Sequence, residues 1–157
     1  MKSKQFMSVK MLLAVVFSAI MVVSCDKDDD NPRLRSVEKD LEQVEESGFT
    51  GSIVLSENSD QSFNIKVTLD STANEEVHLV ELVNGSFDDP GEVALNLKDI
   101  TGTGDKVTVD NTLIKKIKIG EDSVDVNYSS FLTKETFVRV IFSEAYPDSV
   151  LAVGKFK

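Results

Sequence analysis

Residues 63–69 read Phe-Asn-Ile-Lys-Val-Thr-Leu, and they give the clearest indication of fold in this chain of 157 residues. Apolar side chains at every second position alternate with polar ones. Because successive side chains of a strand point to opposite faces, this pattern predicts a β-strand with one face buried and one in solvent. We expect the apolar side chains of this strand to lie in the core and Lys66 to be exposed.

Short apolar runs of the same kind continue from residue 49 to the C-terminus, and Gly, Asn, Asp and Pro separate them. Such spacing is typical of a β-sandwich or a β-barrel. We therefore predict an all-β fold over residues 49–157, a single antiparallel β-sandwich of Greek-key-like topology with about eight short strands. A closed barrel stays open as an alternative. The expected strands cover residues 49–55, 63–69, 77–83, 93–97, 107–109, 113–119, 124–128, 137–142 and 150–156.

Residues 36–48 show a different spacing. Val37, Leu41 and Val44 stand at i, i+4 and i+7, which places them on one face of a helix. Gly48 is a plausible helix end. The sequence predicts a possible short helix here, within a linker that precedes the β-domain.

The N-terminal segment has the features of an export signal. Residues 1–10 carry three lysines and no acidic residue, and an apolar run covers 11–23. This run is shorter than the ~20 residues that a bilayer-spanning helix needs. A basic start, a short apolar core and a small residue at the end are typical of a secretory signal. We predict that residues 1–24 are a signal peptide.

Cys25 is the only cysteine, and it follows directly after Ser24 at the end of this signal. The arrangement resembles the lipobox of bacterial lipoproteins, in which the cysteine becomes the acylated first residue of the mature protein. The resemblance implies an acyl anchor of the palmitate type at Cys25, and several acyl chains hold a protein stably on a membrane. An ordinary cleaved signal with an accidental cysteine, or a short membrane anchor, is the alternative.

The segment after Cys25 is acidic, with four aspartates in residues 26–30. This run resembles the export signal of surface-exposed lipoproteins, and it also fits a solvated tether, because like charges repel. We expect residues 25–48 to contain the lipidated cysteine, the acidic tether and the possible helix. The expected location is the outer membrane, on the cell surface or on the periplasmic face.

The charge balance excludes two classes of partner. Removal of residues 1–24 would leave 14 basic and 27 acidic residues, a net charge of −13. Nucleic-acid binding needs basic patches, and so does electrostatic docking on anionic lipid. With its one cysteine used for lipid, the domain must be stabilised by core burial without a disulfide.

Three stretches of the β-domain, residues 49–55, 81–97 and 137–156, resemble the CHRD domain. This family is a β-sandwich module found in chordin and in many bacterial secreted proteins. The resemblance covers nearly the whole globular part. It implies a sandwich fold, and a role in extracellular binding rather than in a reaction.

The chain departs from the family at the residues that could carry chemistry. CHRD domains usually have a His-x-His-x-Gly element in the central strand and a further histidine in the penultimate strand. Glu81, Val83 and Ile141 stand at those places here, and the glycine is present as Gly85. The resemblance therefore does not imply a histidine site in this chain, and we expect Val83 and Ile141 to be core residues.

Few residues offer catalytic or metal-binding chemistry. His78 is the only histidine, and no nucleophile motif lies near it, so we expect it at the surface or at a strand edge. No His/Cys cluster for zinc or copper is present. Asp88, Asp89 and Glu92 crowd one loop and are a weak calcium candidate, because calcium takes six to eight oxygen ligands. A solvated acidic loop is the favoured interpretation.

Three Asp-Ser-containing triplets resemble the Asp-Ser/Thr-apolar acceptor of a bacterial O-glycosylation system. Their serines are Ser71, Ser123 and Ser149. All three fall at predicted turns, where a transferase could reach them. Asp-Ser is also a common turn pair, which is the simpler reading.

No catalytic motif is present in the sequence. We therefore expect a lipid-anchored, non-enzymatic domain that binds a protein or another extracellular ligand through its loops or an edge strand, without a cofactor. A lipocalin-like small-molecule binder, with the strands closed around an apolar cavity, is the alternative. A metal-dependent enzyme ranks last.

Overall fold

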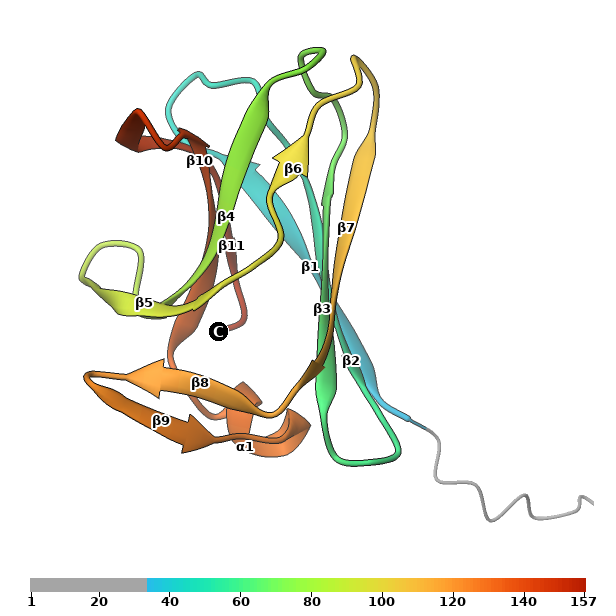
Figure 1. The fold of residues 1–157 in the computed structure, drawn as a ribbon, viewed down its shortest axis with the longest axis vertical. Helices are drawn as coiled ribbons and strands as arrows, with labels where there is room; N and C mark the ends of the chain where they lie inside the picture. Colours follow the sequence, from blue (N-terminus) through green and yellow to red (C-terminus); the bar gives the residue numbers. More distant parts are fainter. Residues whose placement is uncertain (1–33) are drawn as a thin grey trace, which may run out of the picture. The chain divides into compact units, whose positions relative to one another are not determined.

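The computed structural model describes residues 34–157, and eleven antiparallel β-strands and one short helix make up this part of the chain (Figure 1). The predicted all-β fold is confirmed. The predicted signal peptide, Cys25 and the acidic run lie outside the described residues. The elements are β1 (Ser36–Gln43), β2 (Gly51–Glu57), β3 (Phe63–Leu69), β4 (Val77–Gly85), β5 (Pro90–Asn96), β6 (Ile100–Thr101), β7 (Val107–Ile114), β8 (Lys116–Ile119), β9 (Asp122–Asp125), α1 (Tyr128–Leu132), β10 (Thr136–Ser143) and β11 (Tyr146–Lys155).

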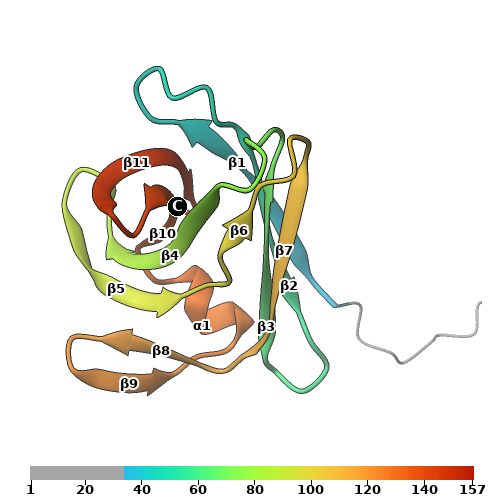
Figure 2. The same cartoon turned by 45° about the horizontal axis from the view of Figure 1, so that its top comes forward.

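Eight strands follow one continuous hydrogen-bonded path, in the order β5-β4-β10-β11-β1-β2-β3-β7. Strand β6 pairs with β4 beside this path, and β8 and β9 form a separate hairpin. Figures 1 and 2 show that the path curls, so that β4 and β10 face β2 and β3 across the interior. The structure is thus one curled sheet, and the two separate sheets of the predicted sandwich are not confirmed.

Residues 36–43 form strand β1, so the predicted helix over residues 36–48 is wrong. The first six residues of β1 pair with β2, while Glu42 and Gln43 pair with β11, so β1 joins the two sides of the curled sheet. Glu38 and Asp40 are exposed and Leu41 is buried, which is the period of a strand. The acidic residues at every second position are a sequence signal for this strand. Pairing with both neighbours satisfies the backbone of β1, and this outweighs the weak helical spacing.

Strand β7 runs through the predicted break at residues 110–111. Asn111 is buried and takes part in the ladder with β3, so it does not end the strand. The chain turns at Leu113 instead, which has a φ of 57° and is 64% exposed. The single predicted strand over 113–119 is therefore the end of β7 followed by the separate strand β8.

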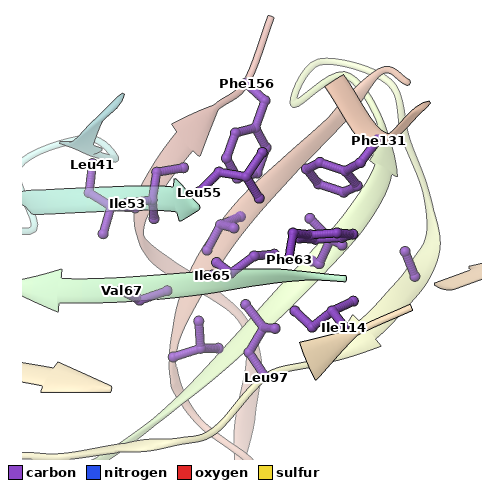
Figure 3. Packing of buried hydrophobic residues seen from close by; sticks show 14 of the residues in the cluster. Leu41, Ile53, Leu55, Phe63, Ile65, Val67, Leu97, Ile114, Phe131 and Phe156 are labelled. Carbon is purple, nitrogen blue, oxygen red and sulfur yellow. The ribbon is translucent and has the colours of Figure 1, made fainter. Parts of the chain in front are cut away.

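The core occupies the inside of the curl. The four apolar side chains of β3 are fully buried and Lys66 is exposed, as the alternation predicts. Phe131 of α1 lies between Phe63 and Phe156, with ring centroids at 4.7 and 5.1 Å (Figure 3). Each fully buried side chain of this size contributes ~1.5–3 kcal/mol. The strands and the core described here belong to one compact unit.

Candidate functional site

His78 is fully buried in β4, so the prediction of a surface or strand-edge position is wrong. It shares the inward face with Val80, because the two are separated by one residue. Its Nδ1 donates to the carbonyl oxygen of Phe142 at 2.9 Å, and its ring meets Phe49 edge-on at 5.2 Å. Within residues 34–157, Nε2 has no hydrogen-bond partner, and Oε2 of Glu76 lies 3.9 Å away. His78 thus holds the end of β10 in place.

Glu81 takes part in an ion pair, and Val83 and Ile141 lie in the core. Arg139 of β10 donates to Glu81 Oε2 from Nε at 2.8 Å and from Nη2 at 2.7 Å. Val83 and Ile141 are buried, as predicted. Gly85 adopts a φ of 84°, which favours glycine. This face of β4 and β10 therefore holds a structural ion pair.

The acidic loop lies at the surface of the domain. Asp88, Asp89 and Glu92 are all exposed. In the part of the chain that the structure describes, no group of three or more His, Cys, Asp or Glu residues is placed to hold a metal ion. The structure thus does not bring the three calcium candidates together.

The three candidate glycosylation sites are accessible. Ser71 lies two residues beyond the end of β3, and all three serines are exposed. Ser123 lies in strand β9 and Ser149 in strand β11, so the predicted turn positions of these two are wrong. Their modification stays a prediction, which the intact mass of the protein from its native host would check.

The β10–β11 turn carries an exposed apolar cluster. Strand β1 starts beside the end of β2, where Ser36 pairs with Ser56, and it runs toward β11. The β10–β11 turn lies at the opposite end of the domain from this start (Figure 1). We call it the distal end. Val77, Phe142 and Tyr146 are 45%, 37% and 62% exposed there, which is unusual for large apolar side chains in one place.

A pocket of about 530 Å³ opens at the distal end. Val77 and Leu79 supply apolar surface, and Asp99 and Glu144 supply two carboxylates. The rings of Phe142 and Tyr146 pack edge-on at 5.9 Å beside it. Its full lining is Val77, Leu79, Asp99, Ser143, Glu144 and Ala145. Sequence reasoning missed this site, because its parts come from three segments that only the fold brings together.

A second groove of about 570 Å³ lies between β5 and β8. These strands run side by side in Figures 1 and 2 without a hydrogen-bonded ladder between them. Asn84 of β4 bridges them, since its Nδ2 donates to the carbonyl oxygens of Lys118 at 2.9 Å and Glu92 at 3.3 Å. We call this groove the seam. It is lined by Val93, Ala94, Leu95, Asn96, Lys116, Ile117, Lys118 and Ser123.

Comparison with known proteins gives no relative. The chain matches no family model, no curated protein and no solved structure. Within residues 34–157, no helix has the length and the apolar character needed to cross a membrane.

Proposed function

We propose that this chain is a lipid-anchored protein of the outer membrane or cell surface whose β-domain binds a protein or another extracellular ligand without catalysing a reaction. The anchor is the acylated Cys25, which follows an apolar run of signal-peptide length. Binding occurs at the distal end.

One observation carries the proposal: the exposed aromatic pair Phe142–Tyr146 beside the distal pocket. Aromatic side chains are common anchors of binding surfaces, because they bury a large area at low conformational cost. The pair lies at the end of the domain opposite Ser36, where β1 begins. A module that is tethered through its N-terminus would present this end to a partner.

The lipocalin-like alternative has weaker support. A closed barrel needs a ladder between the last strands of the path. In the described part of the chain, β5 and β7 end the path without pairing to each other. Phe131 packs against both Phe63 and Phe156 inside the curl, where a lipocalin keeps its ligand cavity.

Site-specific photo-crosslinking in the native host tests the binding surface. A photoreactive residue in place of Tyr146 should give a discrete adduct in intact cells, and the adduct should disappear when Phe142→Ala is added. The matched control is a photoreactive residue at the exposed Lys66 of β3. Equal adducts from both positions, or none from the distal one, would contradict a distal binding surface.

Membrane fractionation tests the anchor. The Cys25→Ser chain should leave the membrane fraction, because the acyl chains that hold it can no longer be attached. If this variant stays with the membrane after a salt wash, the anchor lies elsewhere.

A further inference from the structure

The seam exposes the backbone of two strand edges to each other. Ile119 of β8 and Asp122 of β9 pair across a two-residue turn. Along β8, peptide groups that bond to β9 therefore alternate with peptide groups that point away from β9. Those of Lys116 and Lys118 point away from β9 and toward β5. The bond from Asn84 Nδ2 to the Lys118 carbonyl oxygen agrees with this direction. On the other side, β5 is the end of the hydrogen-bonded path and pairs only with β4.

The floor and walls of the seam are apolar. Ala94 and Ile117, which are 1% and 2% exposed, belong to the main core and lie beneath the floor of this groove. Val93 and Leu95 of β5 line it as well. Residues 116–118 of β8 line the groove, and a stretch of this length spans roughly 10 Å at ~3.3 Å per residue. This shape suits a slender alkyl chain.

The charge of the seam is opposite to that of the domain. Residues 34–157 contain 12 basic and 23 acidic residues. The two ionisable side chains that line the seam are both lysines, Lys116 and Lys118. Lys116 pairs with Asp125 at 3.4 Å, but both partners are well exposed, and such a pair is easily exchanged for another anion. A ligand that places a carboxylate at this rim would meet two ammonium groups.

We propose that the seam binds a free medium-chain fatty acid. The alkyl chain lies along the half-buried Val93 and Leu95, and the carboxylate reaches Lys116 and Lys118. An acidic peptide strand is disfavoured, because a strand that pairs along both edges would displace Asn84 from its two carbonyl partners. The site is separate from the distal end and goes beyond the function proposed above.

An NMR titration of residues 34–157 with butyrate, hexanoate, octanoate and decanoate tests the site. The amide signals of Leu95 and Ile117 should shift, and affinity should rise by up to about fourfold for each methylene that enters the groove. Decyltrimethylammonium, which has the opposite charge, should bind more weakly than decanoate. A chain-length series without a trend would overturn the proposal.

Variants then locate the ligand. Ser123→Phe, at an exposed rim position of β9, should fill the groove and abolish decanoate binding. Lys116→Gln with Lys118→Gln should weaken binding by about two- to fivefold per charge. The matched control, Lys66→Gln with Lys106→Gln, removes two exposed lysines outside the seam and should leave binding unchanged.

Three results would reject the fatty-acid site. These are equal weakening by the two lysine pairs, unchanged binding in a folded Ser123→Phe variant, and tighter binding of a tetra-aspartate peptide at the same amides. Tyr146→Ala should not affect decanoate binding, because Tyr146 lies at the distal end. If decanoate does not bind the seam, the proposed function is therefore unaffected. If the distal end gives no crosslink, the proposed fatty-acid site is unaffected.

Discussion

The curl of the sheet brings distant strands together on two sides of the domain, and these two sides are built differently. On one side β1 continues the backbone ladder, pairing with β2 through residues 36–41 and with β11 through Glu42 and Gln43. On the other side β5 and β8 face each other without a ladder, and side chains make the connection. Asn84 bridges β5 and β8 at the surface. The buried Asn111 of β7 joins Lys98, which follows β5, to Ile65 of β3.

The difference separates two ways of closing a sheet. A backbone ladder tolerates many side chains, because every residue carries the same donor and acceptor. Side-chain bridges depend on the identity of single residues, but they leave a groove with free edges. On the ladder side there is no such space: a Cβ on Gly154 would lie 2.8 Å from Ile53 Cδ1. The ladder side is therefore closely packed, and the bridged side leaves an open groove.

The largest effect is expected on the ladder side. Leu41→Ala removes a side chain of β1 that is 1% exposed, and it should cost ~2–5 kcal/mol in the free energy of unfolding. The control Glu42→Ala, at the exposed neighbour, should change it by less than ~0.5 kcal/mol. Denaturant titration measures both. A small effect of Leu41→Ala would show that β1 is a loosely attached strand.

Asn111→Ala should have the next largest effect. Asn111 Oδ1 accepts from the backbone N–H of Lys98 at 2.7 Å, and its Nδ2 donates to the Ile65 carbonyl oxygen at 3.2 Å. Because the variant leaves buried polar groups without partners, it should cost ~1–3 kcal/mol. Thr112→Ala, at the exposed neighbour, is the matched control. Equal midpoints in urea for both variants would mean that the bonds of Asn111 to Lys98 and Ile65 do not stabilise the fold.

Asn84→Ala should have a smaller and local effect. The lost hydrogen bonds are partly exposed and are worth ~0.5–1.5 kcal/mol each at most. Amide hydrogen exchange in β8 and β9 should accelerate, while exchange in β1 and β2 stays unchanged. Asn74→Ala, at an exposed loop position, controls for the loss of an amide. Uniform acceleration of amide exchange across the domain would show that β8 and β9 do not open independently of the rest of the sheet.

The smallest effect concerns pH. Lys115 bonds to Asp60 at 2.8 Å and, together with hydrogen bonds from Ser62, lowers the pKa of Asp60 from 3.8 to about 2. A depressed carboxyl pKa contributes stability above its unfolded value, and the contribution is lost as pH falls from about 4 through 2. In a carboxyl NMR titration, Lys115→Gln should move the Asp60 midpoint upward. Lys116→Gln, whose lysine contacts Asp125 instead, should not move it.

Part of the fold could be predicted from the sequence because some signals are local. The alternation in 63–69 predicts β3 and its buried face correctly, and the apolar runs later in the chain predict most of the other strands. The failures have a common cause. The spacing of Val37 and Leu41 suggested a helix, and His78 was expected at the surface or at a strand edge. Both predictions failed because neither the partners of β1 nor the packing around β4 can be read from neighbouring residues.

The candidate sites could be predicted even less well. Asp99 and Glu144 of the distal pocket are 45 residues apart, and Val93 and Lys116 of the seam are 23 residues apart. No spacing rule links such positions. The residues singled out by local crowding, Asp88, Asp89 and Glu92, do not converge, because exposed carboxylates in one loop repel each other and remain solvated.

The sequence by itself determined the all-β class, the inward face of β3, the acidic charge and the N-terminal pattern around Cys25. These depend on composition and on the period of side chains along one strand. The tertiary structure alone decided that β1 belongs to the sheet, that His78 is buried, and that the curl closes by a ladder on one side and by asparagine bridges on the other. Those outcomes depend on which strand edges pair with each other. The sequence does not reveal this pairing, because hydrogen bonds between distant strands are formed by backbone groups that are the same in nearly every residue.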